Sequence, residues 1–333
     1  MSTVLKSPVN GQTVDLCARY QHEFDECKKF RETKKLILSL DKKTENPWDN
    51  TTPAPVSFVW ETDEAQSILE ISEDSSFESS DRYTVSGNTF SVCNLKKSTE
   101  YFWRVNESEA QSFVTDSVMP RWIAVDGIGN VRDYGGWQNT DGKRIKQGLI
   151  FRGYKLENSV TGTGIEQLKK LGIKTELDLR RESVDVVDRS CIDESVKYVN
   201  IACNGYEEFA QTEVDNGVCR RLIEFMADSG NYPIYFHCAG GQDRTGTLAF
   251  LMDAILGLDD ETMLKEYELT MLSSPYQKIS RSRKGKFKPF LKHLNKNGSR
   301  KASIRENTLT FLRNAGVTEE TMKQLCDNLL EKA

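Results

Sequence analysis

The chain has 333 residues, of which 38% are apolar and 29% are charged, and its mean hydropathy is −0.55. This length exceeds an average domain of ~100–200 residues, so we expect two domains, and the composition excludes wholesale disorder. Because no apolar run approaches the ~18–20 residues that span a bilayer, a transmembrane segment is excluded. The first residues lack the pattern of a signal peptide, so we expect a cytoplasmic protein; secretion after removal of a signal is the alternative.

The net charge of −5 is unevenly distributed along the chain. Ten basic residues and no acidic one lie between Arg281 and Arg305. A nucleic-acid-binding protein usually has a broader basic face, so we expect no nucleic-acid partner. The eight cysteines include no Cys-x-x-Cys pair, and only three histidines are present. We therefore expect neither a finger-type zinc site nor a disulfide framework, and no metal or cofactor.

The first third of the chain has the pattern of β-structure. Short alternating, β-branched or aromatic segments occur at residues 55–60, 67–72, 83–85, 89–92 and 101–105, which favours a sandwich. Trp60 and the Leu95-x5-Tyr101 pattern resemble a fibronectin type III module over about residues 50–116. Residues 17–40 have helical spacing and are interpreted as an insertion after a first strand at 11–16. We expect residues 1–117 to be an all-β spacer without chemistry.

Beyond residue 120, predicted strands and helices alternate. The strands are expected at 148–152, 173–179, 198–201 and 232–237, and the helices at 164–171, 218–226 and 245–258. Gly172 is placed as the C′ residue of the first helix. This alternation predicts an α/β domain over residues 118–333, with a mainly parallel central sheet flanked by helices.

One segment between a predicted strand and helix carries the chemistry: His237-Cys-Ala-Gly-Gly-Gln-Asp-Arg-Thr-Gly246. Backbone N–H groups of a tight loop at a helix N-terminus form an anion cradle. Gly240 and Gly241 permit the positive φ values that such a loop requires. The helix dipole and Arg244 favour the thiolate of Cys238, which would point at a bound phosphate.

This segment resembles the Cys-x5-Arg signature of cysteine-dependent phosphatases. Upstream, Asn130-Val-Arg-Asp-Tyr-Gly-Gly136, Arg152-Gly153 and Asp178-Leu-Arg180 with Glu182 resemble elements of the bacterial and fungal tyrosine phosphatases, some of which act on lipids. The resemblance covers about residues 120–330. It implies the cysteine-phosphatase fold and metal-free hydrolysis of phosphate monoesters through a cysteinyl-phosphate intermediate.

The resemblance also implies roles for individual residues. Cys238 would be the nucleophile, Arg244 the phosphate clamp, and Thr245 a hydrogen-bond donor to the Cys238 sulfur. The general acid would be Asp243, with Asp133 as the alternative, although an ion pair with a structural arginine is the simpler interpretation of Asp133. The phosphate would be bound by the loop residues Ala239, Gly240, Gly241, Gln242, Asp243 and Arg244.

Three further residues are expected to support the loop. Asp178 and Arg180 would hold it from the neighbouring strand. His237 should point to the opposite side of its strand from the thiol. It would either orient the loop through a hydrogen bond or be a core histidine with its partners satisfied.

The substrate class remains open between two alternatives. The resembled family commonly has lysine where this chain has Gln242, and a lysine would attract the further phosphates of an inositol ring. Phosphotyrosine in proteins is therefore the first expectation, and an inositol phosphate or phosphoinositide the second. A module that binds phosphate without turnover is a third interpretation, disfavoured by the intact Cys238 and Arg244.

Basic residues recur every four positions after Arg281, including Lys284, Lys288 and Lys292. Pro289 is typical of a helix start and Gly298 of a position past its end. A cationic helical face of this kind would contact an anionic surface. The simpler interpretation is a surface helix whose Phe290, Leu291 and Leu294 face the core.

Overall fold

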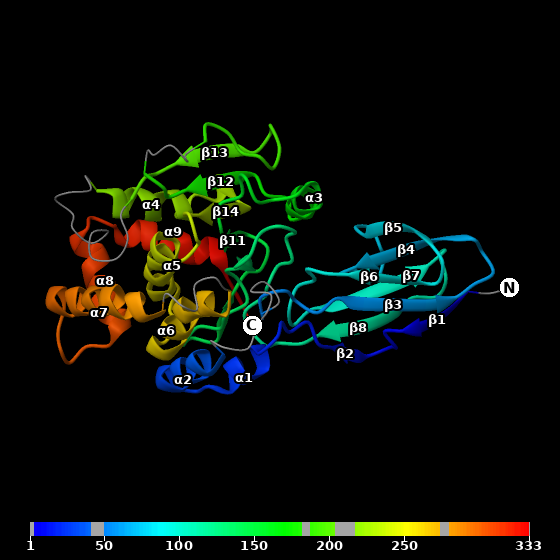
Figure 1. Ribbon diagram of the computed structural model, residues 1–333, viewed down its shortest axis with the longest axis horizontal. Coiled ribbons are helices and arrows are strands. Elements are labelled where there is room, and N and C mark those ends of the chain that lie inside the picture. The colour runs from blue at the N-terminus through cyan, green and yellow to red at the C-terminus, as the bar shows by residue number, and fades with distance from the viewer. Residues whose placement is uncertain (1–2, 41–49, 182–186, 204–216, 274–279, 333) are drawn as a thin grey trace.

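The computed structural model describes residues 3–40, 50–181, 187–203, 217–273 and 280–332. Figure 1 shows an elongated molecule, with strands β1 to β8 at one end and most helices, with the other strands, at the opposite end. We refer to these parts as the N-terminal and C-terminal units. None of the described helices is long and apolar enough to cross a membrane. The mixed α/β class expected from the sequence is confirmed.

The N-terminal unit contains two sheets. One has the order β1-β3-β6, and the other β2-β8-β7-β4-β5, with β2 and β8 parallel and the other pairs antiparallel. In β3, Val56, Phe58 and Trp60 are buried and alternate with exposed residues, and they share one apolar core with residues of the second sheet. The strands are β1 (Val4–Ser7), β2 (Gln12–Val14), β3 (Val56–Glu61), β4 (Gln66–Ser72), β5 (Asp81–Ser86), β6 (Thr89–Val92), β7 (Glu100–Val105) and β8 (Gln111–Thr115).

Two helices, α1 (Gln21–Glu26) and α2 (Phe30–Leu40), lie between β2 and β3 in the chain. The insertion expected there is helical, but it packs on the C-terminal unit beneath α6 (Asp260–Glu268), as Figure 1 shows. Phe24, Ile37 and Leu40 belong to the apolar core of that unit. The N–H of Phe30 also donates to the Glu261 carboxylate at 2.6 Å.

The central sheet of the C-terminal unit has the order β13-β12-β14-β11-β9. All its pairs are parallel except β11 with β9. In β14, Ile234 and Phe236 face the core formed with α4 and α5, whereas Tyr235 faces the core on the α3 side. The strands are β9 (Arg132–Asp133), β11 (Ile150–Gly153), β12 (Thr175–Asp178), β13 (Lys197–Asn200) and β14 (Ile234–His237). A separate antiparallel pair joins β10 (Lys143–Ile145) to β15 (Leu330–Lys332).

The helix α5 (Asp243–Leu256) is buried from Thr245 onward, which its strongly apolar sequence predicts. The other helices are α3 (Gly162–Lys170), α4 (Val218–Ala227), α7 (Ser280–Asn297), α8 (Ile304–Asn314) and α9 (Glu319–Leu329), with 3₁₀ turns η3 (Ser229–Asn231) and η4 (Leu269–Leu272). Gly172 follows α3 at φ +68°, so its predicted C′ position is confirmed.

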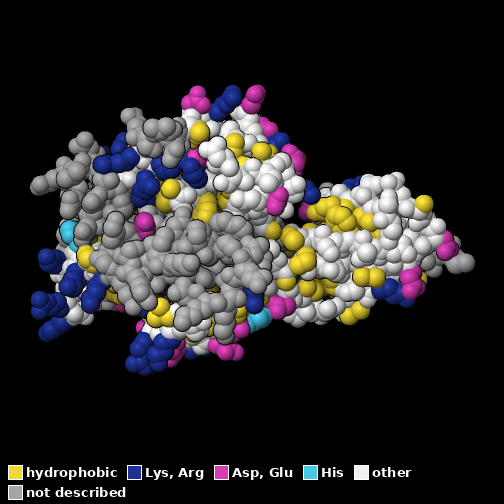
Figure 2. Space-filling view, in the orientation of Figure 1, with side chains coloured by type: hydrophobic (Ala, Val, Ile, Leu, Met, Phe, Trp, Pro, Cys, Tyr) yellow, Lys and Arg dark blue, Asp and Glu magenta, His cyan; other side chains and the backbone are white. Residues whose placement is uncertain are grey.

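One boundary predicted from the sequence is wrong. Pro289 lies inside α7 and does not begin it, because the helix already starts at Ser280. Phe290 and Leu294 are fully buried and Leu291 packs against the core, which confirms the predicted apolar face. Figure 2 shows Lys and Arg side chains at the end of the C-terminal unit where α7 and α8 lie. Lys288 and Lys292 are exposed there, whereas the side chain of Lys284 lies outside the described part.

Candidate active site

The loop from Cys238 to Gln242 joins β14 to the first turn of α5. Because β14 lies between β12 and β11 in the sheet, the loop emerges at the centre of the carboxyl edge of the parallel strands. This is where open α/β sheets bind their ligands. All six residues that the sequence assigned to phosphate binding therefore lie together at one place.

The loop is anchored from behind through its carbonyl groups. Each of the four carbonyls from Cys238 to Gly241 accepts a hydrogen bond from a donor outside the loop. The donors are the His237 ring Nδ1 at 3.1 Å, the Lys155 N–H at 3.4 Å, the Asn130 amide at 3.3–3.4 Å and the Arg152 guanidinium at 3.1 Å. In a trans peptide the next N–H points opposite to the carbonyl. The N–H groups that follow these carbonyls consequently face away from the scaffold, as an anion cradle requires.

Gly241 is the glycine that the loop geometry needs. Its φ is +57°, and a Cβ at this position would lie 2.2 Å from the carbonyl oxygen of Gly153 on β11. Gly240 is not among the glycines with positive φ. Of the two glycines whose conformational freedom the sequence pointed to, only Gly241 therefore uses a positive φ.

A buried charge cluster lies behind the loop. Glu266 on α6 pairs with Arg132 at 2.9 Å and with Arg152 at 2.8 Å. All three side chains are at most 2% exposed, and Arg132 also donates to the Asn130 side-chain oxygen at 2.7 Å. Two positive charges thus face one carboxylate. Through Asn130 and Arg152, this cluster holds the Gly241 carbonyl. The sequence motifs contained these arginines and Asn130 but gave no role to any of them, nor to Glu266.

The electrostatic environment favours the thiolate of Cys238. Burial alone would raise the pKa of this thiol. The positive charge of Arg244, the Thr245 hydroxyl, and the backbone N–H groups of Thr245 and Gln242 outweigh burial, so the pKa is lowered. A thiolate at neutral pH is the form that acts as a nucleophile.

The remaining loop side chains differ in exposure. Asp243 and Arg244 are partly exposed in the first turn of α5, and Thr245 is buried. An Arg244 nitrogen approaches the Leu179 carbonyl at 3.5 Å. Gln242 is only 4% exposed, and its amide lies 4.0 Å from the Met271 sulfur. Among these loop side chains, Arg244 lies close enough to the thiol to lower the pKa of Cys238.

His237 is fully buried beneath the loop. Its Nε2 contacts the Glu176 carboxylate at 2.9 Å, while Nδ1 contacts the Cys238 carbonyl. Burial disfavours the imidazolium, but the hydrogen bond to Glu176 and the charges of Glu176 and Asp178 outweigh it, so the pKa of His237 is raised. A protonated ring donates from both nitrogens. The two interpretations of His237 are thus compatible, because its partners are satisfied and one of them belongs to the loop.

Asp178 and Arg180 form a buried ion pair next to β14. The Asp178 carboxylate accepts from Arg180 at 2.7 Å and from the Tyr198 hydroxyl at 2.7 Å. Arg180 also pairs with Glu157. Burial would raise the pKa of Asp178, but Arg180 and His237 outweigh it and the pKa is lowered. Glu182, which the sequence placed with this pair, lies outside the described residues.

Asp133 is fully buried on β9, where one arginine and two backbone N–H groups contact its carboxylate. Its carboxylate pairs with Arg121 at 2.7 Å and accepts the N–H groups of Gly135 at 2.8 Å and Gly148 at 2.7 Å. These contacts match its simpler interpretation, an ion pair with a structural arginine. They do not connect it to the loop.

Comparisons with known proteins point to one family. The model of a family described as the tyrosine phosphatase family matches residues 123–332. A Cupriavidus necator protein that carries the name of a tyrosine-protein phosphatase is 23% identical over 168 residues, which cover 44% of this chain. The match spans 61% of the length of that relative.

Two solved structures also align with the chain. One is the core catalytic domain of the PP-IP phosphatase SIW14 from S. cerevisiae in complex with citrate, with a TM-score of 0.31 and 14% identity over 49% of this chain and 94% of that one. The other is the Yvh1 phosphatase domain from Chaetomium thermophilum, with a TM-score of 0.24 and 16% identity over 56% and 93% of the respective chains.

Proposed function

The chain belongs to the tyrosine phosphatase family, and on this premise we propose that it hydrolyses phosphate monoesters through a cysteinyl-phosphate intermediate on Cys238. The observation that carries the proposal is the anchored loop. Its four carbonyl groups from Cys238 to Gly241 accept hydrogen bonds from the scaffold, and the Cys238 thiol at its start has a lowered pKa. This combination supports binding a phosphate dianion against the sulfur.

In the first step, the Cys238 thiolate attacks phosphorus, and the bond from phosphorus to the ester oxygen breaks. Arg244 and the loop N–H groups bind the equatorial oxygens, where charge is spread in the transition state. Asp243, the first residue of α5 directly after the loop, donates its proton to the leaving oxygen, and its side chain is partly exposed. Such an acid contributes ~10²–10⁴-fold in rate.

In the second step, a water molecule attacks phosphorus, and the bond to sulfur breaks. Asp243 takes the proton of the water, and the hydroxyl of Thr245 stabilises the departing thiolate. Inorganic phosphate leaves and the enzyme returns to its starting state. Neither step uses a metal ion.

We propose phosphotyrosine in proteins as the substrate. Gln242 is buried and uncharged, so the loop adds no cation for a second phosphate. The alternative is an inositol phosphate or phosphoinositide bound with help from the exposed Lys288 and Lys292. A module that binds phosphate without turnover would retain Cys238 and Arg244 without using their chemistry.

The test is phosphate release in EDTA by the wild type and Cys238→Ser. The substrates are a phosphotyrosine peptide, a phosphoserine peptide, a phosphoinositide and an inositol polyphosphate. We expect release from the phosphotyrosine peptide by the wild type only. Faster release from either inositol substrate would replace the proposed substrate. No release by the wild type, with phosphate still bound, would indicate the binding module.

For the N-terminal part we propose a spacer of the fibronectin type III kind over residues 1–117, followed by the phosphatase domain at 118–333. The shared core of its two sheets supports this assignment. Its helices α1 and α2 would then attach the spacer to the phosphatase domain through their packing on that domain.

A further inference from the structure

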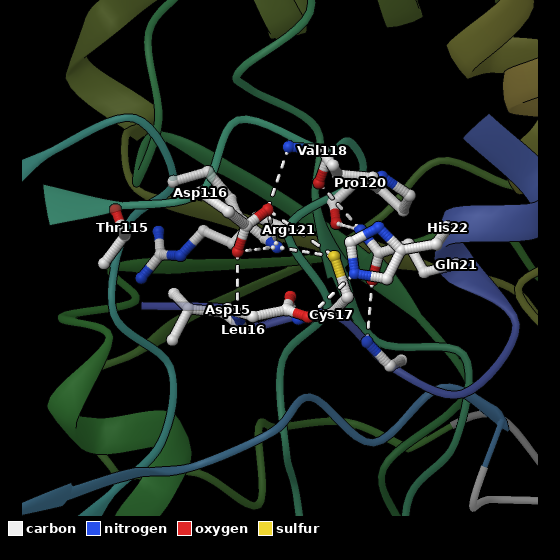
Figure 3. Close-up of polar contacts among 12 residues, drawn as sticks. Asp15, Leu16, Cys17, Gln21, His22, Thr115, Asp116, Val118, Pro120 and Arg121 are labelled. Atoms are coloured by element: carbon white, nitrogen blue, oxygen red, sulfur yellow. Dashed lines mark hydrogen bonds and ion pairs between the residues drawn. The ribbon is translucent and has the colours of Figure 1, made fainter. Parts of the chain in front are cut away.

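Three side chains with metal-binding atoms come together where β2 leads into α1. They are Asp15, Cys17 and His22, and their ligand atoms all lie within 4.8 Å of one another. Figure 3 shows these side chains pointing toward one another beside Asp116. A carboxylate, a thiolate and an imidazole are all ligands of zinc.

We propose that Asp15, Cys17 and His22 bind one zinc ion, which stabilises the turn of the segment that leads from β2 in the N-terminal unit to α1 on the C-terminal unit. From the sequence we expected no zinc site, because the chain has no Cys-x-x-Cys pair and only three histidines. This cluster has one ligand of each type within eight residues, so the absence of such pairs does not exclude it.

The geometry lies close to what a tetrahedral ion needs. Zinc bonds of ~2.0–2.3 Å place neighbouring ligand atoms roughly 3.2–3.8 Å apart. The His22 Nε2 and the Asp15 oxygen are now 2.7 Å apart, and both side chains are more than half exposed. Shifts of about 1 Å, through rotation of these exposed side chains, would therefore create the site. Because the cluster opens to solvent, a water molecule would fill the fourth position.

Surrounding contacts orient the sulfur and balance the charge. The Lys97 ammonium, only 1% exposed, lies 3.4 Å from the Cys17 sulfur and 2.7 Å from Asp116. Asp116 in turn accepts the N–H of Leu16 at 2.7 Å. Supporting contacts of this kind fix the orientation of metal ligands. Since Asp116 neutralises Lys97, the Asp15 carboxylate and the Cys17 thiolate would remain to neutralise the dication.

The position of the cluster gives the ion its role. Two of the chain segments that pass between the units lie here, one before α1 and one between β8 and β9. The Gln21 side-chain amide connects the two segments, because it donates hydrogen bonds to the Val118 carbonyl at 2.8 Å and the Pro120 carbonyl at 2.7 Å. Cys17 precedes Gln21 in the chain and His22 follows it. An ion bound to both would therefore fix the turn that the first segment makes around Gln21.

The test uses the full chain, freed of metal and titrated with Co²⁺ as a spectroscopic substitute for zinc. We expect one equivalent to give a near-ultraviolet band from thiolate-to-cobalt charge transfer, displaced by Zn²⁺. Cys17→Ser should abolish the band, and His22→Ala should weaken binding by at least ~10-fold. Cys93→Ser is the matched control, because that cysteine is also partly buried but lies outside the cluster.

A second readout is thermal unfolding with and without Zn²⁺. Binding to the folded state alone raises Tm, so the wild type and Cys93→Ser should gain stability whereas Cys17→Ser should not. Because His22 is exposed, His22→Ala should fold normally and gain less. A band that persists in Cys17→Ser, or no cobalt band in the wild type, would overturn the proposal and leave an exposed Asp15–His22 ion pair. Loss of phosphatase activity would not bear on it.

Discussion

Replacing Gly241 by alanine tests the anchoring of the phosphate loop most sharply. The new Cβ would lie 2.2 Å from the Gly153 oxygen and 2.5 Å from its carbon. Gly153 is fixed because it pairs with His237 in the parallel register of β11 and β14. The loop rather than the strand must therefore move.

The magnitude follows from the clash and the backbone conformation. Restoring an ordinary contact displaces the loop by about 1 Å, and a misplacement of this size costs on the order of 10²-fold in rate. The φ of +57° adds roughly 1–2 kcal/mol of strain in an alanine. We thus expect a loss of kcat of about 100-fold together with a modest loss of stability.

Gly172→Ala provides the matched control. It has a φ of +68° at the end of α3 but no atom within 4 Å of the added Cβ. It should lose similar stability in thermal unfolding and keep its kcat on a phosphotyrosine peptide. If Gly241→Ala retained the kcat of the wild type, the anchored loop would not be the basis of activity.

Three further predictions concern charges at the site. The rate of Cys238 alkylation by iodoacetamide should fall as the pH drops through the pKa of this thiol, with a midpoint below the ordinary value of ~8.5. Arg244→Ala should raise that midpoint. An unchanged midpoint would contradict the conclusion that Arg244 lowers this pKa. Glu266→Gln should lower the free energy of unfolding in urea by about 3–5 kcal/mol, because it leaves Arg132 and Arg152 buried without their carboxylate. A loss below ~1 kcal/mol would contradict this role of Glu266. Asp243→Asn should lower kcat by ~10²–10⁴-fold, while Asp133→Asn should mainly lower the free energy of unfolding, because it breaks the buried pair with Arg121. The reverse pattern would make Asp133 the acid.

Local patterns predicted the elements that bury one face. Alternation identified β3 and β7, whose buried residues are every second one. It missed β8, in which Phe113 and Val114 stand between polar residues, and β1, a four-residue strand. The packing of α1 and α2 on α6 could not be predicted, because it depends on Glu261 and Lys265, more than 200 residues away.

The loop itself was predictable because its residues are contiguous, from Cys238 to Thr245. Its anchoring was not, since the donors Asn130 and Arg152 and the carboxylate of Glu266 come from three separate parts of the chain. Motif resemblance marked Asn130 and Arg152 without a role, and no local pattern marked Glu266.

The most direct test of the central claim is to trap the intermediate. The wild type is mixed with a phosphotyrosine peptide, quenched within one turnover, and mapped by mass spectrometry for the residue that carries the phosphoryl group. We predict that Cys238 carries it in the wild type and in Asp243→Asn, and that Cys238→Ser neither carries it there nor turns over. A phosphoryl group on another residue, or turnover by Cys238→Ser, would contradict the mechanism.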